Sequence, residues 1–181
     1  MGGLVVALLA ATVGVLTVTA APVSATTVSV ATEQEYRDAL DDLSLDITVG
    51  PHVIDITADF TITLAGDPTY TGTQPLTING YGHTIDGGGT HSALFHNTGQ
   101  ALTINNLTLT NGKSTGGNSG GAILSAQGSV TVTGSTFTNN AAGGSGGAIS
   151  TFGSVTATDS TFTDNTAAGS GRGAPSTPTD R

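Results

Sequence analysis

The five residues Ser119–Ile123, with the sequence SGGAI, return unchanged at Ser145–Ile149, 26 positions later. A second element, STFTNN at Ser135–Asn140, returns as STFTDN at Ser160–Asn165, 25 positions later. Self-similarity at a fixed short period is typical of solenoids and other repeat architectures. The sequence therefore predicts a stack of similar units of about 26 residues each.

Each unit contains about three short segments in which apolar and polar residues alternate. Leu76–Asn79 and Leu102–Asn105 share the sequence LTIN, and further alternating segments are Asp46–Val49, Ile54–Thr57 and Phe60–Leu64. Gly- and Asn-rich turns separate these segments, as expected for strands. Three strands per repeat leave no room for a helix, so we predict an all-β, right-handed, single-stranded parallel β-helix of about four to five coils.

Stacking of the coils assigns side chains to the inside or the outside. Neighbouring parallel strands lie ~4.8 Å apart, so residues one repeat apart lie one above the other. The predicted inward rows are Leu102 and Ile104 under Val130 and Val132, then Val155 and Ala157, with Phe137 under Phe162. The predicted outward rows contain Thr103, Asn105, Thr131, Thr133, Thr156 and Thr158, and Asn140 and Asn165 form a turn ladder.

The solenoid is preceded by the only helical pattern outside the N-terminal apolar stretch. Thr32–Glu35 has the form of a capping box, and Tyr36, Leu40 and Leu43 fall on one helical face. A solenoid end exposes apolar core and strand edges, so a helix here would serve as a cap. We assign residues 26–45 to a linker and this capping helix, and residues 46–168 to the β-helix.

The first 25 residues have the pattern of an export signal. Leu4–Val18 is an apolar run, and small residues precede a cleavage site expected after Ala25, with Ala21 as the alternative. The segment Met1–Gly3 lacks the usual basic residue, and an uncleaved membrane anchor is the competing interpretation. Either way, the sequence predicts an extracellular or cell-surface protein.

The composition excludes several classes of function. The 181-residue chain has 13 acidic and only four basic residues, a formal net charge of -9, and no cysteine. Nucleic-acid binding requires clustered cations, and disulfides or thiolate metal sites require cysteine. With 9% charged residues, the surface must consist largely of uncharged polar groups.

No catalytic constellation is predicted. No Lys or Arg falls on a predicted strand, and Lys113 is placed in a glycine loop. Glycoside hydrolysis requires two carboxylates at close range, whereas the candidate acids flank a turn or lie in different coils: Asp55, Asp59, Asp86, Asp159 and Asp164. The sequence therefore predicts a non-enzyme, without catalytic or cofactor-binding residues.

Aromatic and histidine residues suggest little more. Sugar-binding proteins favour aromatic platforms, but there is no Trp, and outside the cap helix the tyrosines are Tyr70 and Tyr81. His83, His91 and His96 match no compact metal-ligand spacing, so we predict one turn and two loop histidines and no metal site.

The C-terminal end of the repeat array carries a further expectation. In the 26-residue register, two inward positions become Pro175 and Pro178, which cannot donate to a strand ladder. Residues 169–181 are thus predicted to be a disordered tail or a truncated coil, the latter from a truncated or frameshifted gene. An uncapped last coil predicts concentration-dependent self-association through its edge.

The paired motifs Gly-Gly-Ala-Ile and Phe-x-x-Asn, at Phe137–Asn140 and Phe162–Asn165, resemble the repeat of the polymorphic outer-membrane protein family of chlamydial surface proteins and adhesins. Residues 76–90 look like an entry coil of the wider pectate-lyase-like β-helix superfamily. The resemblance implies surface display, adhesion or an interaction scaffold with a protein or glycan partner. It transfers no site, because the motif residues are structural in the family.

Two other functions remain open at this level. A degenerate or partial polysaccharide-active enzyme is the main alternative, because the pectate-lyase-like superfamily includes lyases and hydrolases. An ice-binding solenoid is a minor one, since Thr131–Thr133 and Thr156–Thr158 place Thr-x-Thr pairs on stacked coils.

Overall fold

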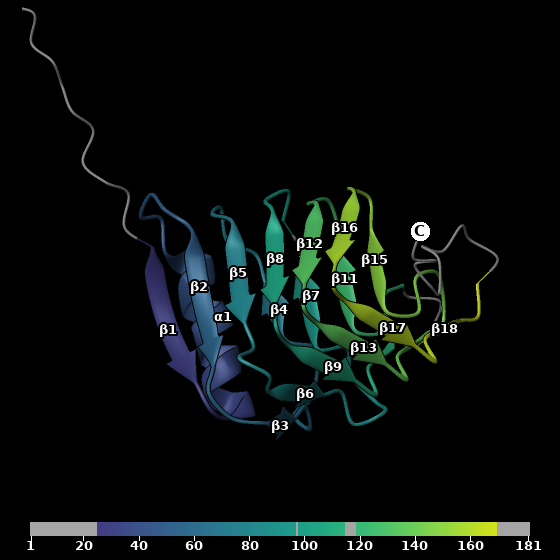
Figure 1. Cartoon of the computed structure of the whole chain (residues 1–181). Helices are drawn as coiled ribbons and strands as arrows, with labels where there is room; N and C mark the ends of the chain where they lie inside the picture. The colour runs from purple at the N-terminus through teal and green to yellow at the C-terminus, as the bar shows by residue number, and fades with distance from the viewer. Residues whose placement is uncertain (1–24, 97, 115–118, 170–181) are drawn as a thin grey trace, which may run out of the picture.

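The computed structural model describes residues 25–96, 98–114 and 119–169 and shows a parallel β-solenoid of about five turns with one short helix (Figure 1). The predicted all-β parallel β-helix is confirmed. Every strand pairs in parallel with the equivalent strand of the coil before or after it.

Four sheets run along the solenoid. The six-stranded sheet contains, in order, β1 (Thr26–Val30), β2 (His52–Ile56), β5 (Leu76–Asn79), β8 (Leu102–Asn105), β12 (Val130–Thr133) and β16 (Val155–Thr158). The five-stranded sheet contains β3 (Phe60–Thr61), β6 (Thr84–Asp86), β9 (Thr108–Thr110), β13 (Thr136–Thr138) and β17 (Thr161–Thr163). The four-stranded sheet contains β4 (Thr69–Tyr70), β7 (Leu94–His96), β11 (Ile123–Ser125) and β15 (Ile149–Thr151). The three-stranded sheet contains β10 (Lys113–Ser114), β14 (Ala141–Ala142) and β18 (Thr166–Ala167).

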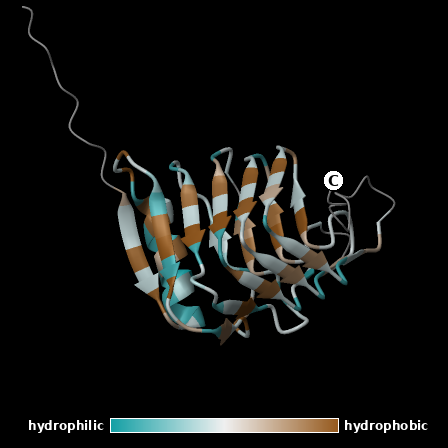
Figure 2. Cartoon of the chain, in the orientation of Figure 1, coloured by the Kyte–Doolittle hydropathy of each residue, from teal (hydrophilic) through white to brown (hydrophobic). Residues whose placement is uncertain are grey.

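The predicted stacking register is confirmed. Val130 pairs with Leu102 on one side and Val155 on the other, and Thr131 lies between Thr103 and Thr156. The rings of Phe137 and Phe162 stack with their centroids 4.9 Å apart. Figure 2 shows the result, with hydrophobic and polar residues alternating along the strands of successive coils. The inward apolar rows form one continuous core through the earlier coils, whereas Val155 and Ala157 on β16 are exposed.

The two glycines of the repeated Gly-Gly-Ala-Ile element are required for steric reasons. Gly120 has a φ of +77°, a left-handed conformation that side chains disfavour. At Gly121 a Cβ atom would collide with the carbonyl oxygen of Gly147 in the next coil. The first glycine therefore makes the turn, and the second allows two coil backbones to approach closely.

The turn ladder is also confirmed. Asn140 Nδ2 donates to Asn165 Oδ1 at 2.9 Å and also to the carbonyl oxygen of Leu109 at 3.0 Å. Asn140 Oδ1 accepts from the backbone N–H of Gly112 at 2.8 Å. A fully buried asparagine thus satisfies backbone groups at a corner where strands cannot pair.

Helix α1 (Glu33–Leu45) lies at the N-terminal end of the solenoid and contacts β1, β2 and β4. Thr32 is its N-cap and accepts from the backbone N–H of Glu35, as predicted, whereas the Glu35 carboxylate binds the N–H of Ala31 rather than that of Thr32. The predicted apolar face, Tyr36, Leu40 and Leu43, is buried.

The predictions for two segments that precede β2 differ from the structure. Residues 26–30, placed in a linker by the sequence, form edge strand β1, which pairs with β2 in register. Asp46–Val49, expected to be a strand, is an irregular segment in which the polar Asp46 and Thr48 turn toward Thr26. Consequently Ile47 and Val49 point outward and are 84% and 75% exposed.

The predicted strand Phe60–Leu64 is shortened because Glu33 of the helix intercepts its backbone. The Glu33 carboxylate accepts the N–H groups of Thr63 and Leu64 at 2.8 and 3.0 Å and the Thr63 hydroxyl at 2.8 Å. Burial opposes ionisation of Glu33, but these hydrogen bonds outweigh it, so its pKa is lowered. Glu33 also pairs with Arg37 at 2.9 Å.

Replacing Glu33 with alanine should cost about 2 kcal/mol of unfolding free energy, because two backbone donors lose a charged acceptor. Urea unfolding followed by circular dichroism measures this loss. Gln34→Ala is the matched control, since the Gln34 side chain is exposed and bonds to the exposed Asp38 one turn along the same helix. Equal losses of unfolding free energy in the two variants would show that the Glu33 carboxylate does not stabilise the backbone of Thr63 and Leu64.

Candidate functional site

A ladder of polar side chains runs along the outer face of the six-stranded sheet. Asn79 Nδ2 donates to Asp55 Oδ1 at 2.8 Å, and Asn105 Nδ2 donates to Asn79 Oδ1 at 3.0 Å. These residues occupy equivalent positions on β2, β5 and β8. We call Asp55, Asn79 and Asn105 the amide ladder; Thr133 and Thr158 continue its row on β12 and β16.

Tyr81 lies beside the amide ladder, at the corner that follows β5. Its hydroxyl donates to Asp55 Oδ1 at 3.2 Å, while 62% of the residue remains exposed. Desolvation and the nearby Asp55 carboxylate raise the pKa of the Tyr81 hydroxyl. Tyr81 has a φ of +51°, an outlier for a bulky residue.

The candidate carboxylates serve separate local structures. Asp59 accepts the backbone N–H of Thr84 at 2.8 Å and faces His83 Nδ1 at 3.1 Å. The Thr84 bond and then His83 lower the pKa of Asp59. Asp86 accepts the N–H of Gly88 and the amide of Asn111. Asp55, Asp59 and Asp86 each bind a separate set of partners within the protein.

The remaining two candidate acids form corners. Asp159 and Asp164 have φ values of +50° and +54°, a conformation that Asp tolerates better than most residues. Asp159 directly follows strand β16 and Asp164 directly follows strand β17, both in the last described coil. Their placement is that of turn residues, as the sequence predicted.

The three histidines named by the sequence lie in different environments. His83 faces Asp59, and His91 Nδ1 lies 3.7 Å from Asp67 Oδ1. His96, expected in a loop, is instead on β7 and fully buried. Over the three described ranges, no group of three or more His, Cys, Asp or Glu is placed to hold a metal ion.

His96 belongs to a polar cluster inside the solenoid that the sequence did not reveal. Its ring stacks on Tyr70 at a centroid distance of 5.6 Å, and the Tyr70 hydroxyl lies 2.8 Å from His52 Nδ1. Tyr70 is fully buried and offers no platform to a sugar at the surface. His52 Nε2 lies 3.6 Å from Asp46 Oδ2, too far for a hydrogen bond, and no other described residue provides it with a partner.

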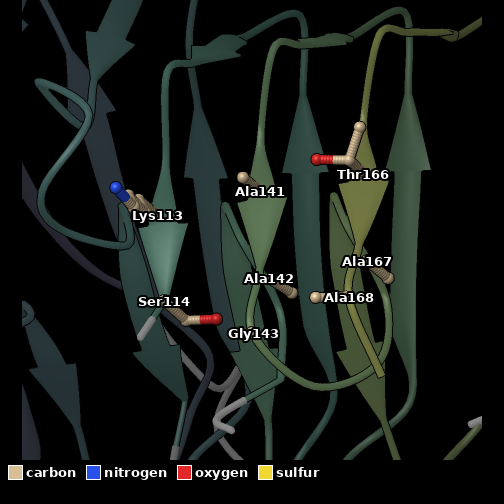
Figure 3. Close-up of a pocket in the computed structure, with 8 residues that line it drawn as sticks. All are labelled: Lys113, Ser114, Ala141, Ala142, Gly143, Thr166, Ala167 and Ala168. Carbon is tan, nitrogen blue, oxygen red and sulfur yellow. The ribbon is translucent and has the colours of Figure 1, made fainter. Parts of the chain in front are cut away.

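Lys113 also differs from its prediction. It begins strand β10 rather than lying in a glycine loop, and it is exposed. Beside it a depression of about 360 Å³ runs over β14 and β18, lined mainly by small residues (Figure 3). The lining residues are Lys113, Ser114, Ala141, Ala142, Gly143, Thr166, Ala167 and Ala168. Its alanines offer packing surface but no reactive group.

The threonine rows follow the predicted register. On the six-stranded sheet, Thr77, Thr103, Thr131 and Thr156 form one row. On the five-stranded sheet, Thr-x-Thr pairs stack on β9, β13 and β17. On the six-stranded sheet, the outward row beside these threonines is the amide ladder at β2, β5 and β8. The members of the amide ladder hydrogen-bond to one another.

None of the helices in the described ranges is long and apolar enough to cross a membrane. Comparison with known proteins identifies a family for the chain. Neither curated proteins nor solved structures gave a match. Residues 27–143, well over half of the chain, match the family described as "Putative pectate lyase-like adhesive domain". The chain belongs to this family of pectate lyase-like adhesive domains.

Proposed function

We propose that this protein is a secreted or cell-surface β-helix that acts as a non-catalytic adhesion module. The observation that carries the proposal is an outer face of hydrogen-bonding groups, uncharged apart from Asp55, in a chain of the adhesive-domain family. These groups are the amide ladder and the threonine rows. Such a face offers many weak polar contacts in register, which suits attachment by multiple repeated interactions.

The repeat motifs support the same role. The Gly-Gly-Ala-Ile and Phe-x-x-Asn elements resemble those of chlamydial-type surface adhesins, and membership of that repeat family is part of this proposal. Export is the other part. The proposed signal peptide, residues 1–25, ends at the first described residue and otherwise lies outside the described ranges, as do Pro175 and Pro178 of the predicted tail.

Polysaccharide cleavage is the competing activity. It is disfavoured because Asp55, Asp59 and Asp86 are each engaged in separate hydrogen bonds within the protein. Beads coated with the exported protein should adhere to cell surfaces above the level of albumin-coated beads. The same preparation should release neither reducing sugar nor unsaturated uronate from pectin. Absence of adhesion, or steady product release from pectin, would contradict the proposed function.

We further propose that the C-terminal edge mediates self-association. All four residues of β16 are exposed, and among the described strands β16 pairs only with β12. Unpaired strand edges with apolar neighbours favour association.

Light scattering tests this proposal and should show an average mass that rises with protein concentration. Val155→Lys places a charge on the inward side of β16 and should reduce this rise. Thr156→Lys, on the outward side, is the control, and a constant monomer mass would refute this edge contact.

A further inference from the structure

The turn that carries Tyr81 is longer than its equivalents in later coils. Between the paired residues Asn79 and Thr84 lie four residues, whereas two separate Asn105 from Thr108 at the same corner of the next coil. The coil containing β12 and β13 also has two residues there. Insertions in a solenoid repeat project from one face and often form its binding surface.

The inserted tyrosine is held in a fixed position although it is largely exposed. Its left-handed backbone conformation persists only because surrounding structure imposes it. The hydroxyl bond to Asp55 Oδ1 fixes the ring above the amide ladder. Beside it, a Cβ placed on Gly82 would have no atom within 4 Å apart from those of Gly82 and its two chain neighbours, so this flank of the turn is open.

The chemistry of this corner selects a class of ligand. An exposed aromatic ring offers a flat apolar face, and Tyr combines it with a polar tip. Asp55 Oδ2 takes no part in the bonds to Asn79 and Tyr81, and carboxylate and amide groups can pair with adjacent hydroxyls. A pyranose ring presents this same combination of a C–H face and hydroxyl edges.

The negative charge of the protein further restricts the class of sugar that this corner can bind. The described cations, Arg37 and Lys113, lie elsewhere: Arg37 binds Glu33 at the N-terminal helix, and Lys113 is on the three-stranded sheet. The chain carries a formal charge of -9, and Asp55 adds a local negative charge. Acidic sugars such as uronates would therefore be repelled, whereas neutral sugars would not.

We propose that Tyr81, Asp55 and Asn79 form a binding subsite for a neutral hydroxyl-rich glycan, with Asn105 extending the contact to the next coil. This inference rests on the proposed adhesive function and names its ligand class. Tyr81 provides the stacking platform, and the amide ladder accepts and donates hydrogen bonds to sugar hydroxyls.

The test is affinity electrophoresis of the full exported chain through gels containing arabinogalactan, xyloglucan, mannan or dextran, with polygalacturonate as the acidic comparison. At least one neutral polysaccharide should retard the protein, and polygalacturonate should not. Tyr81→Asn should weaken the retarding interaction at least about ten-fold. Because Asn tolerates the left-handed conformation, its thermal midpoint should equal or exceed that of the parent.

Two further variants sharpen the result. Tyr81→Phe keeps the ring but removes the bond to Asp55, so an intermediate loss is expected. Phe152→Ser removes another exposed aromatic side chain, 91% exposed at a different corner, and should leave binding unchanged. Retardation by no neutral polysaccharide, equal binding by Tyr81→Asn, or preferential binding of polygalacturonate would overturn the subsite. If beads still adhere after such a result, for example to a protein surface, the adhesive function stands and only the glycan site is refuted.

Discussion

Phe137→Ala should lower the free energy of unfolding by about 4 kcal/mol, the usual cost of removing a buried phenylalanine side chain. Phe137 is fully buried, and its ring is stacked almost parallel to that of Phe162, at an interplanar angle of 7°. On its other side it pairs with Leu109 in β9. The truncation therefore opens a cavity between three consecutive coils, which closely packed backbones cannot close.

Urea unfolding monitored by circular dichroism measures this effect. Phe162→Ala is the informative comparison, because Phe162 lies on the outermost described coil and is only partly buried. We expect it to cost less than half as much, and Phe152→Ala, at an exposed corner, to cost almost nothing. Similar losses for Phe137→Ala and Phe162→Ala would show that the last coil is covered in solution.

The second large effect is acid sensitivity centred on His96. Burial lowers the pKa of His96 from 6.5 to about 4. The ring is fully enclosed: Nδ1 lies 3.1 Å from Ser125 Oγ, and Nε2 is buried without a hydrogen-bond partner among the described residues. The unfolded chain takes up a proton below pH 6.5, whereas the folded chain does so only near pH 4. The free energy of unfolding is therefore unaffected by His96 above pH 6.5, and it falls by about 3 kcal/mol as the pH drops to 4.

Unfolding free energies measured at intervals from pH 7 to pH 4 test this prediction. Glu33, Asp46 and Asp59 have lowered pKa values, so their losses begin only below the ordinary carboxyl values of 4.5 and 3.8. His96→Gln should flatten the slope between pH 6.5 and 4.5, and His83→Gln, at a partly exposed corner, should not. An unchanged slope in His96→Gln would exclude His96 as the acid-sensitive group.

Periodicity predicted the solenoid and the register of its later coils because repeated sequence reports repeated packing. The copies at Ser119–Ile123 and Ser145–Ile149 align the strands directly. The first coils lack such copies, and there local alternation was misleading: Asp46–Val49 alternates but is held by Thr26. Likewise Phe60–Leu64 alternates, but Glu33 takes its last backbone donors.

The polar groups were harder to place than the apolar ones. His96 pairs with Ser125 in β11, and Tyr70 pairs with His96, so this inward row holds a chain of polar residues that hydropathy assigns to loops. The subsite at Tyr81 depends on a contact to Asp55, 26 residues earlier. In register, Asp55 pairs instead with Asn79, 24 residues later, so the repeat period alone does not predict the contact with Tyr81.

The coil-by-coil pairing of the four sheets also determines how the molecule would respond to pulling. The hydrogen bonds between coils lie along the axis of the stack, so tension between its two ends loads the bonds of one coil at a time. Each coil that detaches releases about 26 residues, or roughly 90 Å of extended chain. The solenoid would therefore lengthen in steps at modest force, and a tether of this kind dissipates mechanical work before its attachment is lost.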